Sequence, residues 1–164
     1  MVFGMISAAI ARRKAPQHED AYFGRMRFMR DHWLGQAPNQ HQQTIEVMLE
    51  GGNAERRDFS RQQAMYEKVL LRCTEVVDQA RPLIEQFVED KGYGPRESPG
   101  FFDNPRLEHV LLPDPDAMDM RWDLTVLGPW PGFRQRSDDD NPDDNEAMFV
   151  IEMNGWQPTA VDLA

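Results

Sequence analysis

A change in the spacing of apolar residues constrains the fold of this chain more than any other feature. In "RMRFMR" arginines alternate with Met26 and Phe28, and alternation is clearest in "QTIEVMLE". Such alternation is typical of half-buried strands. Between residues 58 and 88 the apolar residues recur instead at three- and four-residue steps, as on one side of an amphipathic helix. After "YGPRESPGFFDNP", which has the composition of a loop, the two-residue spacing returns.

Grouped strands around one helical block predict an α+β fold. We expect an antiparallel β-sheet of about six strands, arranged as β-meander, helix and β-meander, with one long or kinked helix packed on one face. Ser60 with Gln63 fits a capping box at the start of the helix, Asn53 is an earlier alternative start, and Gly92 fits its stop. Pro82 predicts a kink or a break, because proline lacks the N–H and clashes with the carbonyl four residues back.

The chain has 164 residues, which is enough for one domain with a real core. We assign residues 18–164 to a single α+β domain and residues 1–17 to an N-terminal helical arm. The arm contains "MVFGMISAAIARRK", in which positive charge follows the apolar stretch, the reverse of a secretory signal peptide. We expect the arm to dock on its own domain, with a targeting or membrane-surface role as the alternative.

The formal net charge is −10, which disfavours nucleic acid and anionic membranes as partners and speeds encounter with a basic protein. The charge is uneven: residues 1–36 carry a net +3 and residues 137–164 a net −8. The only cysteine is Cys73, which suits a reducing compartment, so we expect a cytoplasmic protein that does not enter a membrane.

The acidic segment "SDDDNPDDNE" begins at Ser137 and precedes a strand-like run. A calcium loop of EF-hand type requires Gly at its sixth position and Glu at its twelfth, counted here from Asp139. The chain has Asp144 and Val150 at those positions, so a specific calcium site is not predicted. The segment is either a solvated connection or a docking site for a basic partner.

Other reactive residues point to no chemistry. His109 falls within a strand pattern and is expected to be packed or at an edge, while Cys73 lies on the apolar stripe of the helix as a small hydrophobe. No nucleotide-binding, nucleophile-elbow or metal-ligating motif is present, so we predict no enzyme, no cofactor and no metal. Trp33 and Trp122 are expected in the core, whereas Trp130, between two prolines in "GPWPG", is expected to be partly exposed.

Short motifs give the chain a resemblance to known domains. They are Phe23-Gly24, Trp33-Leu34-Gly35, Val47-Met48-Leu49, the helix from Ser60, and "DDNEAMFVIEMNGW". In this order they resemble uncharacterised small bacterial α+β domains, over roughly residues 21–163. The resemblance implies an immunity-type or accessory protein of a bacterial toxin system, and it assigns no functional residue.

The sequence therefore predicts an acidic protein-binding module, in one form an immunity protein that neutralises a basic toxin or effector. Acids would speed association and aromatic rings would anchor the partner. The predicted partner-binding residues are Trp130, Phe133, Asp138, Asp139, Asp140, Asp143, Asp144, Glu146 and Trp156. The alternatives are a small metal-dependent hydrolase, built from scattered acids and His109, and a structural or oligomeric subunit. The oligomeric state is not predicted.

Overall fold

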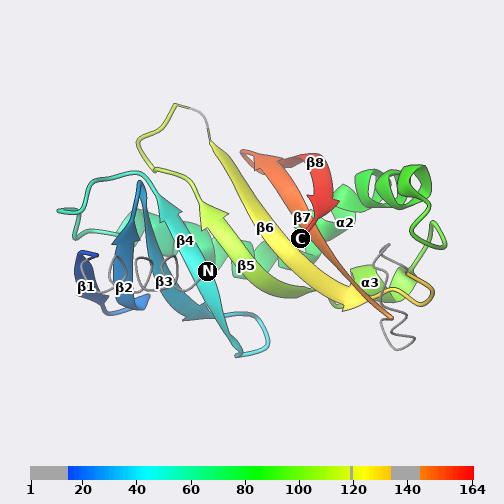
Figure 1. Cartoon of the computed structure of the whole chain (residues 1–164), viewed down its shortest axis with the longest axis horizontal. Coiled ribbons are helices and arrows are strands. Elements are labelled where there is room, and N and C mark those ends of the chain that lie inside the picture. The colour runs from blue at the N-terminus through cyan, green and yellow to red at the C-terminus, as the bar shows by residue number, and fades with distance from the viewer. Residues whose placement is uncertain (1–14, 119, 134–144) are drawn as a thin grey trace, which may run out of the picture.

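The fold is a single sheet with one long helix on one of its faces. A computed structural model describes residues 15–118, 120–133 and 145–164. Figure 1 shows α2 running behind the sheet. The helices are α2 (Ser60–Lys91) and α3 (Pro99–Asp103), and the strands are β1 (Gln17–Asp20), β2 (Gly24–Met29), β3 (His32–Pro38), β4 (Thr44–Glu50), β5 (Arg106–Leu112), β6 (Arg121–Pro129), β7 (Glu146–Asn154) and β8 (Gln157–Leu163).

The sheet has eight strands in sequence order and is mixed, whereas the sequence predicts about six antiparallel strands. The α+β class is confirmed, and the antiparallel prediction is wrong at one pairing. β4 and β5 are parallel, with Met48 opposite Leu111, and the other neighbours are antiparallel. A parallel pair cannot be closed by a hairpin and needs a long crossover, which α2 supplies between β4 and β5. Because α2 carries the chain back across the sheet, β5 runs in the same direction as β4.

The first fifty residues hold four strands, whereas their alternation predicts a three-stranded meander. The additional strand is β1, whose sequence "QHED" has no apolar residue. His18 nevertheless packs on Trp33 and Phe59, with ring centroids 6.2 and 5.9 Å away. Gln17 thus belongs to the sheet, while residues 1–14 of the predicted arm lie outside the described residues. A polar strand leaves no periodic signal, which explains why it is missed.

Helix α2 begins and ends where its sequence predicts, although its cap differs. Ser60 is the first helical residue, and its N–H donates to the carboxylate of Asp58 at 3.0 Å. The predicted capping box does not form, because the Gln63 side chain donates to Glu67 instead, at 3.0 Å. Gly92 ends the helix in the left-handed region at φ 66°, a conformation that glycine adopts without strain.

Pro82 does not break the helix, which continues as one element to Lys91. Its buried stripe, which includes Val69, Cys73, Val77 and Ile84, packs against the inward-facing residues of the sheet. This contact between helix and sheet forms the hydrophobic core. Every described helix lies on that side or at the end of the sheet, so the opposite face is open within the described part of the chain (Figure 1).

Candidate functional site

Two aromatic residues predicted as partner anchors lie in the core. Trp130 is fully buried, and its indole N–H donates to the carbonyl of Pro95 at 2.9 Å. Its ring packs against Phe101 and Phe149 at centroid distances of 5.5 and 5.6 Å. Phe133 is also buried. The expected exposure of Trp130 is therefore wrong, because the proline-rich turn directs the ring into a cluster of aromatic side chains.

The other predicted partner residues are dispersed. Trp156 is half-buried against Trp122, at 5.4 Å between ring centroids, and the guanidinium of Arg72 lies 4.6 Å from its ring. Glu146 is exposed at the start of β7. Asp138, Asp139, Asp140, Asp143 and Asp144 lie outside the described residues, and their role stays a prediction. The structure does not bring the aromatic residues together on one surface.

The open face of the sheet presents a row of side chains that crosses the central strands. Leu34 on β3 is opposite Met48 on β4, and Met48 is opposite Leu111 on β5. The row continues from Leu111 to Asp123 on β6 and then to Glu152 on β7. The three apolar side chains are half-exposed, since α2 covers only the other face. An apolar stretch therefore leads directly into two carboxylates, and we call these five residues the central row.

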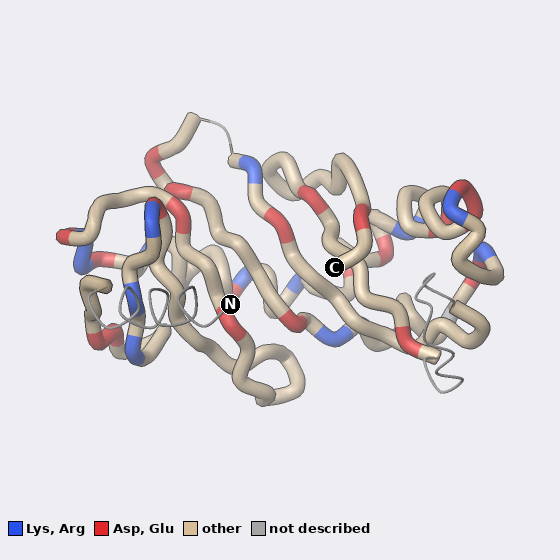
Figure 2. The backbone as a smooth tube through the Cα atoms, in the orientation of Figure 1, with Lys and Arg blue, Asp and Glu red and all other residues tan. Residues whose placement is uncertain are grey.

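A second row of side chains lies beside the central row and adds one carboxylate, that of Glu46. Glu46 on β4 is opposite His109 on β5, and His109 is opposite Thr125 on β6. Figure 2 shows acidic positions spread along the middle strands of the sheet. Within residues 15–118, 120–133 and 145–164, the ion pairs found do not include Glu46, Asp123 or Glu152. The open face thus holds carboxylates without a salt bridge from this part of the chain.

The acidic end of the central row is hollowed. A shallow pocket of about 380 Å³ is lined by Glu50, Leu111, Asp123, Glu152 and other residues of β6 to β8. Burial, together with the charges of Glu50 and Glu152, raises the pKa of Asp123 to about 6. Burial also raises the pKa of Glu50. Arg121 also lines this hollow, so a cationic group placed there would meet three carboxylates and one guanidinium.

His109 and Cys73 have environments that fit packed residues. Burial lowers the pKa of His109, although the nearby Glu46 opposes this, so the ring is mainly neutral at pH 7. Burial raises the pKa of the Cys73 thiol to about 11, while a side-chain contact from Gln40 acts in the opposite direction. A thiol with so high a pKa is a poor nucleophile at neutral pH.

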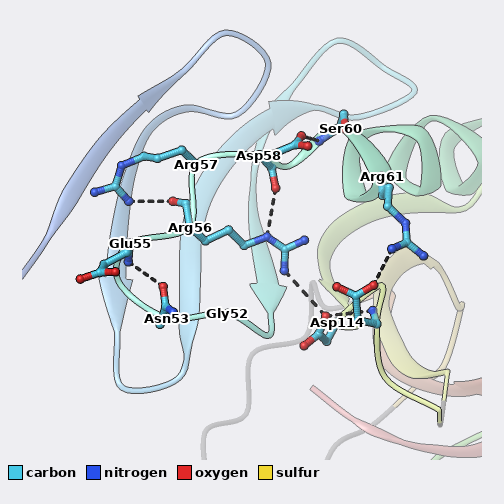
Figure 3. Close-up of a pocket in the computed structure, with 10 residues that line it drawn as sticks. Gly52, Asn53, Glu55, Arg56, Arg57, Asp58, Ser60, Arg61 and Asp114 are labelled. Carbon is cyan, nitrogen blue, oxygen red and sulfur yellow. Dashed lines mark hydrogen bonds and ion pairs between the residues drawn. The ribbon is translucent and has the colours of Figure 1, made fainter.

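A larger hollow of about 610 Å³ lies where the β4–α2 connection meets the β5–β6 connection (Figure 3). Three arginines line it, and each is already bound. Arg56 donates to the carbonyl of Asp58 at 3.0 Å, Arg57 to that of Ala54 at 2.8 Å, and Arg61 to the carboxylate of Asp116 at 2.6 Å. The Arg61 contact joins the start of α2 to the β5–β6 connection, and an ion pair of Arg56 with Asp114 at 3.7 Å joins the two connections. We interpret the residues that line this hollow as structural, because they hold neighbouring segments of the chain together.

Three further findings bear on function. Among the described residues, no group of three or more His, Cys, Asp or Glu side chains is arranged to hold a metal ion. None of the described helices combines the length and apolar content of a membrane span. No family model matched the chain, and neither the comparison with curated proteins nor that with solved structures returned a match.

Sequence reasoning did not identify the central row. Leu34, Met48, Leu111, Asp123 and Glu152 belong to five different strands, and only the pairing of those strands aligns them. One signal in the sequence could have pointed to Asp123. In "RWDLTVLG" the residues alternate, so Asp123 is expected on the face of the strand opposite to Trp122 and Leu124.

Proposed function

We propose that this chain is an acidic protein-binding module that holds a basic partner on the open face of its sheet. The observation that carries the proposal is the central row, in which half-exposed Leu34, Met48 and Leu111 lead into Asp123 and Glu152. A partner surface with lysine or arginine beside apolar side chains matches this row in both charge and polarity. Apolar contacts supply affinity at such interfaces, and complementary charge supplies orientation and rate.

The overall charge of the chain supports the same partner. A net charge of −10 attracts a cationic protein over a distance of about 10 Å at moderate salt. The acidic residues from Asp138 to Glu146 have the same sign and would add to this attraction. An immunity-type protein that masks a basic toxin is one form of such a module. A single buried cysteine, Cys73, fits the cytoplasm as the compartment.

A metal-dependent hydrolase centred on His109 has less support. Its imidazole is flanked by Glu46 and Thr125 on the neighbouring strands. A hydrolytic metal site needs about three protein ligands with an open position, and the described residues offer no such group.

The test is site-specific photo-crosslinking in cells that make the protein. A photoreactive residue at Met48 samples the open face, and one at Leu71, which is 86% exposed on α2, samples the opposite side as a matched control. We expect Met48 to capture a basic protein that Leu71 does not capture. The captured band should weaken in a Glu50→Gln, Asp123→Asn, Glu152→Gln variant, because that variant retains the shape of the face without its charge.

The proposal fails under two results. Capture of the same proteins from Met48 and Leu71 would show that the open face is not a specific surface. Capture of a partner with no basic surface, unaffected by the triple variant, would show that the carboxylates do not recognise it. A Glu55→Gln, Glu67→Gln, Asp103→Asn variant removes the same charge at exposed positions elsewhere and should leave capture unchanged.

A further inference from the structure

Asp123 lies where the apolar part of the central row meets its acidic end. Its backbone neighbours across the sheet are Leu111 on one side and Glu152 on the other. The apolar neighbour removes water from one side of the carboxylate, and the acidic neighbour adds like charge on the other. Both effects favour the protonated form of Asp123.

Charged and titratable side chains surround Asp123 on its own strand and on neighbouring strands. The titratable and charged side chains around it are Glu46 and Glu50 on β4, His109 on β5, Arg121 on β6 and Glu152 on β7. Arg121 lines the same hollow. Even so, burial together with Glu50 and Glu152 holds the pKa of Asp123 at about 6.

We propose that Asp123, with Glu50 and Glu152 beside it, makes the open face a pH-sensitive docking surface that releases its basic partner on mild acidification. The inference rests on the proposed function, since it concerns the regulation of that same surface. Near pH 7.5 the hollow holds the negative charges of Glu50, Asp123 and Glu152 and the positive charge of Arg121. Near pH 5 about nine in ten Asp123 side chains are protonated, because the pKa of about 6 is one unit higher. The hollow then loses about one charge at its centre.

The loss of that charge sets the size of the effect. A partly exposed ion pair contributes at most about 1 kcal/mol, which corresponds to a change in affinity of up to roughly fivefold. Protonation also turns one of the two Asp123 oxygens into a donor, so a guanidinium can no longer donate to both oxygens. Affinity should therefore fall between pH 7 and pH 5 and remain nearly constant above pH 7.

The experiment measures binding of a short capped peptide that alternates lysine and leucine, by fluorescence anisotropy at several pH values. The proteins are the full-length chain, the Asp123→Asn variant and an Asp103→Asn control, since Asp103 is exposed at the end of α3. We expect the wild type and the control to lose more affinity than Asp123→Asn, by a factor of up to roughly five, on acidification from about pH 7.5 to about pH 5. The Glu152→Gln variant should move the midpoint to lower pH, because it removes one of the charges that raise the pKa of Asp123.

The outcomes separate this inference from the proposed function. If the peptide binds equally well at both pH values, or weakens equally in wild type and Asp123→Asn, the open face docks cations but is not pH-sensitive through Asp123. If the peptide binds none of the proteins at either pH, the docking surface itself is refuted. A carboxyl titration of Asp123 by nuclear magnetic resonance that gives a pKa near 4 would overturn the pH inference whatever the peptide does.

Discussion

Replacing Asp123 by Asn should stabilise the protein at neutral pH and have little effect in acid. The pKa of Asp123 is raised from 3.8 to about 6 in the folded chain, so the folded state binds the proton more tightly than the unfolded state. By linkage, this group contributes stability that is fully present below about pH 4 and is lost as the pH rises through about 6. Asparagine has a similar shape and no charge, so it avoids that loss.

The structure sets an upper limit on the effect. A shift of roughly two pKa units corresponds to about 3 kcal/mol, at about 1.4 kcal/mol for each unit. Asp123 keeps some contact with solvent, and Glu50 is exposed enough to relax when the charge is removed, so screening reduces this limit. We expect Asp123→Asn to raise the free energy of unfolding by about 1–2 kcal/mol near pH 7.5 and by nearly zero near pH 4.

The assay is urea unfolding followed by tryptophan fluorescence at a series of pH values. The difference between wild type and variant at each pH isolates Asp123, because other titrating groups contribute to both proteins. Asp103→Asn is the control and should show no pH-dependent difference, since its side chain is exposed. A variant that is destabilised by the same amount at every pH would refute the reasoning, because Asp123 would then act through hydrogen bonding and not through charge.

Three further predictions concern α2 and the aromatic core. Pro82→Ala should raise the free energy of unfolding by about 1–3 kcal/mol, because α2 continues through this position and alanine restores the N–H that proline lacks. The measurement is the midpoint of urea unfolding, and an unchanged midpoint would contradict this prediction. Trp130→Phe should lower stability by about 1–3 kcal/mol in the same assay, because the carbonyl of Pro95 loses its indole donor. Cys73 should react with thiol reagents only as the protein unfolds, because it is 2% exposed and its thiol pKa is about 11; rapid labelling of the native protein would refute its burial.

The elements of the fold were largely predictable, because most of them carry a periodic signal. The strands that include Met26, Val47, Leu124 and Ile151 alternate in polarity, and the ends of α2 lie at Ser60 and Lys91 beside recognisable residues. Two of the mistakes about the sheet have clear physical causes. β1 has no apolar residue to reveal it, and the parallel pairing of β4 with β5 depends on where α2 returns the chain. Local periodicity contains neither kind of information.

The candidate site was not predictable by the same reasoning. The sequence directs attention to the densest acidic segment, whereas the perturbed carboxylate is the isolated Asp123. Its environment is created by Leu111 and Glu152, which are 12 positions before it and 29 after it in the numbering of the chain. The burial of Trp130 has a similar origin, since its indole N–H finds Pro95 from a distant segment. Density of charge is visible in a sequence, but cross-strand proximity is not.

Acidic residues on an open sheet face have a simple alternative explanation, which is that they keep the face soluble. This explanation suits exposed charges such as Glu46, which lies on the same face. It does not account for Asp123, whose burial raises its pKa and therefore lowers the stability of the folded protein at neutral pH. An asparagine would be as polar and less costly at this position. Residues that lower stability while a harmless substitute exists are characteristic of binding surfaces, where function and stability compete. The charge of Asp123 is therefore an argument for the proposed docking surface, which solubility alone does not supply.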